Sequence, residues 1–210
     1  GTGSGKSTLV SLIPRFFDVN SGEVCVDGIN VKNYTFEQLR GKIGLVPQRS
    51  VLFSGTIREN LRWRAETATD GEIWAAIETA QAKDFVEKLP DGLDTMIMQG
   101  GKNLSGGQRQ RLTIARALVG NPEILILDDS ASALDYATDS RLRSAIRRLS
   151  SDMTVIIVSQ RAASVLHADQ ILVLDDGENV GLGTHDELRK TCEIYAEICS
   201  TQLGEEAENA

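Results

Sequence analysis

The chain opens on a glycine-rich run that leads directly into a helical pattern of apolar residues. Residues 1–8 read GTGSGKST, and apolar side chains recur at helical spacing over residues 9–13. Glycines leave main-chain N–H groups open to a ligand, and the following helix adds positive charge at its N-terminal end. Such a loop is typical of phosphate binding, although a glycine-rich turn before an ordinary helix is the alternative. In this interpretation Lys6 reaches the β- and γ-phosphates and the Ser7 hydroxyl ligates Mg²⁺. The expected phosphate contacts are Gly1, Thr2, Gly3, Ser4, Gly5, Lys6, Ser7 and Thr8.

The phosphate-loop pattern is incomplete at its start. It needs another glycine five places before Gly5, and that position would precede residue 1. The strand that should lead into the loop would precede residue 1 as well. We therefore expect an N-terminally truncated piece of a longer protein, with the first strand of the phosphate-loop fold missing.

Several short apolar runs predict an α/β fold. Residues 124–127 (ILIL) and 155–158 (VIIV) are continuous apolar runs, as expected for parallel strands buried on both faces, and residues 171–174 resemble them. Residues 42–46 predict a further strand, and residues 56–89 are mostly helical in pattern. The sequence thus indicates an α/β core with a mostly helical insert at about residues 48–118. None of the apolar runs is long enough to span a bilayer.

Two acidic residues follow the apolar run at 124–127. A buried strand that ends in a carboxylate can hold Mg²⁺ through water, and a second acidic residue can orient an attacking water molecule. Asp128 and Asp129 occupy these two positions. A strand followed by an acidic turn is the alternative, but the preceding phosphate loop favours the catalytic interpretation.

The third motif is LSGGQ at residues 104–108. Ser105 and Gln108 form a capping-box pattern, which is a common way to begin a helix. An ordinary capped helix disfavours two glycines in its first turn, where each costs up to ~1 kcal/mol against alanine. Gly106 and Gly107 would instead let a phosphate approach the exposed helix N-terminus.

With this third motif, the chain resembles the ATP-binding cassette (ABC) family over residues 1–203. LSGGQ between a phosphate loop and an acidic strand end resembles the ABC signature, and Gln48 matches the Q-loop glutamine that ligates Mg²⁺ and senses the γ-phosphate. Residues 132–135 (SALD) match the D-loop. The resemblance implies a P-loop NTPase (RecA-like) core with a mostly parallel sheet and an α-helical ABC subdomain. It also implies ATP and Mg²⁺ as ligands. The residues implied for ATP are the phosphate loop, Gln48, Ser105, Gly106, Gly107, Gln108 and Asp128; those for Mg²⁺ are Ser7, Gln48 and Asp128.

The region after the Q-loop resembles the exporter type. Residues 46–48 read VPQ and residues 52–60 read LFSGTIREN, while Gln48 and Ser105 are 57 positions apart, too close for long coiled-coil arms. In such exporters the transmembrane domain precedes the ATPase on the same chain. The resemblance therefore implies a multi-pass membrane protein whose ATPase lies on the cytoplasmic face of the plasma (cell inner) membrane. It also implies a second ABC ATPase domain as partner, because each ATP of an ABC dimer lies between two domains.

Two catalytic positions depart from the family pattern. The family usually has glutamate as general base where this chain has Asp129, and histidine where it has Gln160. A weaker departure is QGG at residues 99–101, where many exporters have Glu-Arg-Gly. Of the catalytic set Lys6, Gln48, Asp129 and Gln160, two members are thus changed. We expect the degenerate half of a heterodimeric exporter; the alternatives are a homodimer that hydrolyses ATP with Asp129, or a soluble ABC ATPase of translation or DNA repair.

The composition argues against a nucleic-acid partner. The formal net charge is −8, and no stripe of lysine and arginine runs along the chain. Three cysteines show no metal-ligand spacing, and Cys192 and Cys199 are expected on the inner face of one C-terminal helix. Residues 201–210 are acidic and predict a flexible tail.

Overall fold

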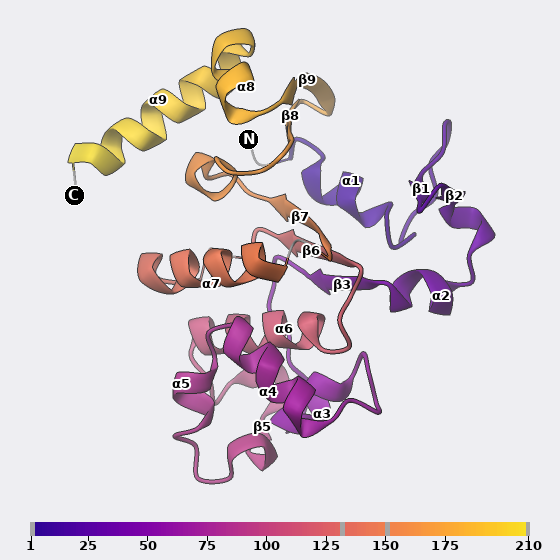
Figure 1. Cartoon of the computed structure of the whole chain (residues 1–210), viewed down its shortest axis with the longest axis vertical. Coiled ribbons are helices and arrows are strands. Elements are labelled where there is room, and N and C mark those ends of the chain that lie inside the picture. Colours follow the sequence, from indigo (N-terminus) through magenta and orange to yellow (C-terminus); the bar gives the residue numbers. More distant parts are fainter. Residues whose placement is uncertain (1–2, 131–132, 150–151, 209–210) are drawn as a thin grey trace. The chain divides into compact units, whose positions relative to one another are not determined.

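The computed structural model describes residues 3–130, 133–149 and 152–208, with residues 203–208 described by their main chain alone. The chain forms two units (Figure 1). One unit comprises Gly1–Val24 and Ile157–Ala210, and the other comprises Cys25–Ile156. Among the described residues no helix combines the length and the apolar character that crossing a membrane requires.

A parallel pair of strands lies at the centre of the unit Cys25–Ile156. Strand β3 (Ile43–Val46) runs parallel to β6 (Ile124–Asp128), with Ile43 opposite Ile124 and Val46 opposite Leu127. The sheet has the order β3-β6-β7, and the boundary between the two units falls within β7 (Thr154–Val158). Leu125 and Ile126 are fully buried, as expected for a strand that is covered on both faces. The predicted strands at these three places are confirmed.

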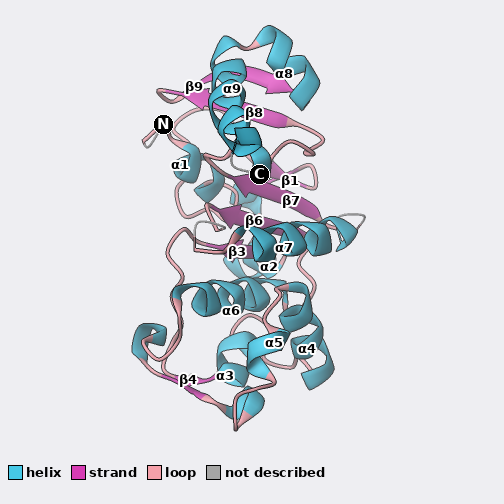
Figure 2. Ribbon diagram, turned by 90° about the vertical axis from the view of Figure 1, so that its left-hand side faces the viewer, coloured by secondary structure: helices cyan, strands magenta, loops and turns pink. Residues whose placement is uncertain are grey.

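Helices are the main regular elements of the chain between β3 and β6. They are α3 (Ile57–Arg62), α4 (Asp70–Thr79), α5 (Lys83–Val86) and α6 (Gly106–Leu118), and they gather as one group in Figures 1 and 2. The short strands β4 (Gly55–Thr56) and β5 (Met96–Ile97) pair antiparallel beside them, and the 3-10 turns η2 (Gly92–Asp94) and η3 (Gln99–Gly101) lie on either side of β5. Thr56 and Thr69 begin α3 and α4 with complete capping boxes. The helical character of this stretch is confirmed, and its standing as a separate subdomain stays a prediction.

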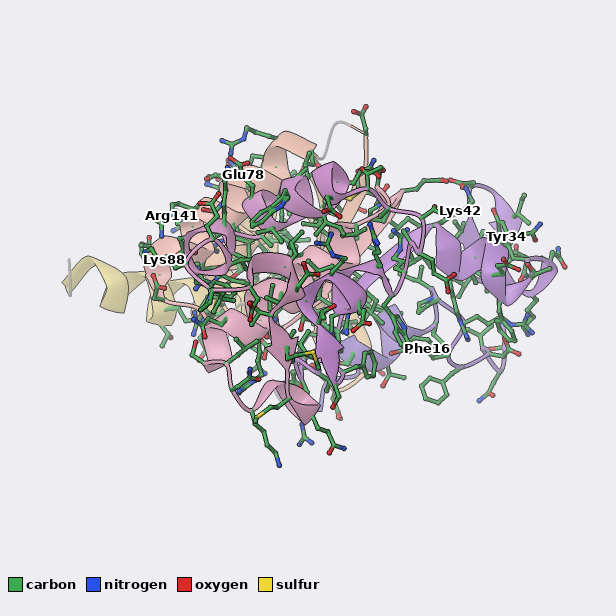
Figure 3. The ribbon with its side chains drawn as sticks, turned by 90° about the horizontal axis from the view of Figure 1, so that it is seen from below. Phe16, Tyr34, Lys42, Glu78, Lys88 and Arg141 are labelled. Atoms are coloured by element: carbon green, nitrogen blue, oxygen red, sulfur yellow. The ribbon has the colours of Figure 1, made fainter. Side chains whose placement is uncertain are left out.

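A small hairpin precedes the sheet in the same unit. It is formed by β1 (Cys25–Val26) and β2 (Ile29–Asn30) and is followed by η1 (Val31–Asn33) and α2 (Phe36–Gly41). Tyr34 and Lys42, both labelled in Figure 3, attach the hairpin to its neighbours. The Tyr34 hydroxyl donates to the Val26 carbonyl at 3.1 Å, and Lys42 forms ion pairs with Asp27 and Glu123. The remaining helix of this unit is α7 (Tyr136–Leu149).

The other unit contains an antiparallel hairpin, which corrects one expectation. Its elements are α1 (Lys6–Ser11), η4 (Ala162–Ser164), β8 (Ile171–Asp175), β9 (Glu178–Gly183), α8 (His185–Thr191) and α9 (Glu193–Glu208). We expected residues 171–174 to resemble the buried parallel strands, but β8 pairs antiparallel with β9. Asp176 and Gly177 explain the difference, because both have positive φ (45° and 82°), as the central residues of a type I′ hairpin turn require.

The two buried cysteines also differ from the expectation. Cys192 is the C-cap residue that follows α8 and Cys199 belongs to α9, so they do not share one helix. Both are buried in a common apolar cluster with Leu188 and Tyr195. Helix α9 continues to Glu208, through most of the segment for which the sequence predicts a flexible tail.

Candidate nucleotide-binding site

The glycine loop leads into α1 in a conformation that only glycine adopts readily. Gly3 and Gly5 have φ of 93° and 84°, and Gly5 is the N-cap of α1. Ser4 is buried, and the Lys6 ammonium donates to its hydroxyl oxygen at 2.5 Å. The first turn of α1 contains no acidic side chain, so its main-chain N–H groups suit an anionic ligand. Gly1 and Thr2, which we also expected at this loop, lie outside the described residues.

The ends of the two parallel strands bring Gln48 and Asp129 together. Val46 and Leu127 are register partners, so Gln48 and Asp129 each lie two residues beyond the same edge of the sheet. The Gln48 side-chain amide donates to the Asp129 carboxylate over 3.4 Å, which is a long hydrogen bond. Asp129 has a positive φ of 45°, and such a strained conformation in a non-glycine residue is common at functional sites. Asp128 ends β6 directly before it.

The signature segment begins α6. Ser105 is the N-cap: its hydroxyl accepts from the Gln108 main chain at 3.2 Å, and its own N–H donates to the Gln108 side chain at 2.9 Å. The predicted capping box is therefore present. Ser105 and Gly106 are exposed, which leaves this helix end accessible.

The two signature glycines have different surroundings. A Cβ atom at Gly106 would meet only the far end of the Arg109 side chain, 3.9 Å away. At Gly107 it would lie 3.3 Å from the Ala133 carbonyl oxygen, which is main chain of the predicted D-loop. The signature therefore packs against the D-loop of the same chain at this point. Ser132, the first residue of that loop, lies outside the described residues.

Comparison with known proteins assigns these motifs to a family. A sequence profile described as ABC transporter matches residues 1–132. An uncharacterized ABC transporter ATP-binding protein of Mycobacterium tuberculosis is 51% identical over 204 residues, which cover 96% of this chain and 35% of that protein. The chain belongs to the ABC transporter family.

Further comparisons agree with this assignment. A Staphylococcus aureus protein, named as a candidate multidrug export ATP-binding/permease protein, is 47% identical over 201 residues, with 96% of this chain and 35% of that protein covered. The solved structure of a bacterial Atm1-family ABC exporter with ATP bound matches with a TM-score of 0.92 and 39% identity, over 97% of this chain and 36% of that one. The chain is therefore an ABC ATPase domain of the exporter type with an α/β P-loop fold, and it spans about a third of the length of its curated relatives.

Gln160 follows β7 in the unit that also holds the glycine loop. Its main-chain carbonyl accepts a hydrogen bond from the Gln202 side chain of α9 at 2.9 Å, and the same side chain accepts from the Ala162 N–H at 2.8 Å. The ABC position that usually holds histidine is therefore attached to the C-terminal helix through its main chain. The glycine loop and Gln160 belong to one unit, whereas Gln48, Asp128, Asp129 and the signature belong to the other.

The D-loop aspartate has a structural role that its motif does not reveal. Asp135 accepts from the Thr138 main chain at 2.9 Å at the beginning of α7. Hydrogen bonds from the Thr138 hydroxyl and main chain hold the pKa of Asp135 below its ordinary value. This carboxylate therefore stays ionised at neutral pH and stabilises the N-terminal end of α7.

Sequence reasoning missed three side chains that support the ABC motifs. Asn60 is buried and bonds the main chain of Phe53 and Thr56, which shapes the loop that follows the Q-loop. Arg64 bonds three main-chain carbonyls, at the end of α2, the start of β3 and the C-terminal end of α6, and Gln202 bonds the main chain of the segment after β7. Asn60 ends the LFSGTIREN segment that indicated the exporter type, but that pattern does not reveal its contacts, and the other two contacts join segments that are distant in sequence.

Proposed function

We propose that this ABC domain binds Mg-ATP at an interface with a second ABC ATPase domain and serves an exporter. In this proposal its own site hydrolyses ATP slowly, and its intact signature completes the site of a different partner chain. The glycine loop, with Lys6 and Ser7, holds the phosphates. Ser105 and Gly106 face the γ-phosphate bound on the partner.

The accessible end of α6 is the observation that carries this proposal. Ser105 is exposed with its capping box complete, so the helix end is formed by the chain itself. Gly106 leaves space for close approach of a ligand, because no main-chain atom occupies the place of its missing Cβ. An anion at this end would meet N–H groups of the first turn and the positive end of the helix dipole.

The geometry around Asp129 supports a weak site of this chain's own. A general base must lie within ~2.6–3.2 Å of the proton it removes. Aspartate is one methylene shorter than the usual glutamate, and a retraction of about one ångström can lower the rate by about 100-fold. The Asp129 carboxylate also accepts a hydrogen bond from Gln48, which directs it toward the Q-loop. Gln160 can donate a hydrogen bond but carries no charge.

The oxygen donors fit Mg²⁺, which prefers hard oxygen ligands and keeps several waters. The Ser7 hydroxyl, the Gln48 amide oxygen and the Asp128 carboxylate would hold the ion, directly or through water. When bound, Mg²⁺ neutralises part of the phosphate charge. Asp128 ends the strand that pairs with β3, close to the segment that carries Gln48.

Exposed apolar side chains support docking of a transmembrane part on the helical region. They come from the loop after the Q-loop, the end of α3 and β5, which are joined by the β4–β5 pairing and by the hydrogen bond from Gly100 N to the Leu52 carbonyl. Phe53 stacks on Trp63 with ring centroids 4.5 Å apart, and Trp63 is 66% exposed. Relatives named as ATP-binding/permease proteins carry the permease on the same chain. We therefore place this domain at the cytoplasmic face of the plasma membrane, with the transmembrane part upstream of residue 1. The exposed apolar side chains are Val51, Phe53, Trp63, Met96 and Met98.

Two other functions are compatible with the same family. In a homodimeric exporter, Asp129 would act as the base in both sites. In a soluble ABC ATPase of translation or DNA repair, no hydrophobic spans would precede residue 1, whereas an exporter should show about six. The sequence upstream of residue 1 decides between the exporter and the soluble protein.

An asymmetry experiment decides between heterodimer and homodimer. Ser105→Arg places a bulky cation where the partner's ATP docks, so we expect it to abolish turnover of the whole complex. Asp129→Asn removes a base that contributes little, so most of the turnover should remain. Both variants are purified with the same partner and assayed side by side at saturating Mg-ATP. Equal losses would show that both sites hydrolyse ATP and would favour the homodimer.

A further inference from the structure

Arg64 bonds three main-chain carbonyls that belong to three different segments. Its Nε donates to the Ile43 carbonyl at the start of β3 at 3.2 Å. Its Nη1 donates to the Val119 carbonyl at the end of α6, and its Nη2 donates to the Gly41 carbonyl at the end of α2, both at 2.6 Å. We call this group of Arg64 and the carbonyls of Gly41, Ile43 and Val119 the Arg64 clamp.

Only arginine can form the clamp. A guanidinium presents five N–H donors in a fixed planar fork, whereas a lysine ammonium is a compact point on a flexible stem. The side chain is partly buried, and this burial lowers the pKa of Arg64 without removing its charge at any physiological pH. The turn after α6 leaves room for the guanidinium, because a Cβ atom at Gly120 would lie 3.1 Å from Arg64 Nη1.

The clamp fixes one end of α6, and the signature occupies the other end. Val119 is the C-cap of α6, and the helix of 13 residues is about 20 Å long. Near the clamp α6 also packs closely on β3, where no side chain fits between Gly44 and the Ala117 carbonyl. A tilt of about 5° at the clamped end would displace the signature end by about 2 Å over this length.

We propose that Arg64 is a positioning residue for the signature, which it orients by fixing the C-terminal end of α6 to the start of β3. This inference rests on the proposed role of Ser105 at the partner's nucleotide. Misplacement of a catalytic group by about 1 Å can lower a rate by about 100-fold. A loosened clamp therefore reduces turnover through the direction of α6, without touching the glycine loop.

The test uses the complete subunit with its partner. Arg64→Met removes the donors and keeps an apolar stem, and Arg64→Lys keeps the charge without the fork. Arg62→Met is the matched control, because Arg62 also bonds a carbonyl, that of Ala68, but only within the helical region. We expect Arg64→Met to lower kcat at least 10-fold while the affinity for a fluorescent ATP analogue changes less than 2-fold. Arg64→Lys should lie between this variant and the wild type, and Arg62→Met should stay within 3-fold of the wild type.

A second readout measures the orientation of α6 without any turnover. Spin labels at positions 102 and 37, in a subunit with exposed Cys25 replaced by serine, report the distance between the segment just before the signature end of α6 and α2. We expect Arg64→Met to broaden this distance distribution and Arg62→Met to leave it unchanged. An unchanged distribution for Arg64→Met, or a broadened one with normal turnover, would overturn the proposal. Loss of nucleotide affinity in parallel with kcat would also overturn it, since that indicates general unfolding.

The outcome is separable from that of the proposed function. Ser105→Arg is included in the same series. If Ser105→Arg leaves turnover intact, the signature does not serve a partner, and the proposed function fails on that result alone. The distance distributions of the Arg64 variants still show whether the clamp orients α6.

Discussion

Gln202 of α9 donates through its side-chain amide to the main-chain carbonyl of Gln160 at 2.9 Å. The oxygen of the same amide accepts from the Ala162 N–H at 2.8 Å, so one side chain bonds the main chain on both sides of Arg161. The conformation of the segment after β7 therefore depends on α9, although about 40 residues separate the two in sequence. The C-terminal helix thus supports the position at which the ABC family usually has histidine.

Gln202→Ala should loosen the segment around Gln160. Loss of two hydrogen bonds, each worth about 1 kcal/mol, predicts a fall of about 1–2 kcal/mol in local stability. Faster hydrogen exchange of the Ala162 amide in the complete subunit would report this. Gln160→Ala is the control, because it keeps both main-chain bonds and should leave that amide protected. Equal exchange in both variants would contradict a role for Gln202.

Asn60→Ala should destabilise the protein much more than Asn103→Ala. Both side chains bond main-chain groups, Asn60 those of Phe53 and Thr56 and Asn103 those of Met96 and Met98. Asn60 is 2% exposed, whereas Asn103 is exposed, so water can replace only the bonds of Asn103. We expect the free energy of unfolding, measured by urea denaturation, to fall by about 2–4 kcal/mol in Asn60→Ala and by less than about 1 kcal/mol in Asn103→Ala. Similar values for the two variants would refute the argument.

Gly44→Ala should destabilise the protein strongly and Gly41→Ala should not, although the two glycines are three residues apart. A Cβ atom at Gly44 would overlap the Ala117 carbonyl oxygen, which is main chain and cannot turn aside, and would lie 3.1 Å from the Pro122 ring. We expect Gly44→Ala to lower the free energy of unfolding by about 3 kcal/mol or more. Gly41 has open space around it at the end of α2, so alanine there should be neutral or slightly stabilising. The melting temperatures of both variants, compared with that of the wild type, test this difference.

Tyr195 should make the protein sensitive to alkaline pH. Burial, with the neighbouring Cys199, raises the pKa of Tyr195 to about 12, and its hydroxyl bonds His185 Nδ1 at 2.9 Å. The hydroxyl of Tyr195 therefore keeps its proton up to a higher pH in the folded state than in the unfolded state, where the pKa of tyrosine is about 10. The contribution of Tyr195 to the free energy of unfolding is therefore complete below about pH 10 and is lost between about pH 10 and 12.

The measurement compares Tyr195→Phe with the wild type. The melting temperature of Tyr195→Phe should fall less steeply than that of the wild type from pH 10 to pH 12. Tyr136→Phe, at a residue that is 73% exposed, should keep the slope of the wild type. A wild-type slope in Tyr195→Phe would show that other groups cause the alkaline loss.

The predictable parts of this fold are those in which local pattern and burial agree. The apolar runs at 124–127 and 155–158 became β6 and β7, and the capping box at Ser105 began α6 as expected. The run at 171–174 is equally apolar, but its pairing depends on Asp176 and Gly177 after it. Their turn conformation, rather than the apolar run, determines that β8 pairs antiparallel.

The motifs of the candidate site could be predicted from the sequence, but the contacts between its residues could be predicted only in part. The spacing of the motifs indicated Gln48 and Asp129, and the parallel register explains why they meet. The contacts of Arg64 and Gln202 end on main-chain carbonyls, which every residue type carries. No pattern of side chains can therefore reveal such partners before the chain is folded.

The unequal surroundings of Gly106 and Gly107 change what a signature sequence can reveal. Gly107 lies against the Ala133 carbonyl, so packing within the chain favours glycine there even after nucleotide contact is lost. Gly106 has no such neighbour, so only the proposed contact with nucleotide requires its lack of a side chain. In related chains whose activity is unknown, substitution of the first signature glycine is therefore the more informative sign that selection for nucleotide binding has ended.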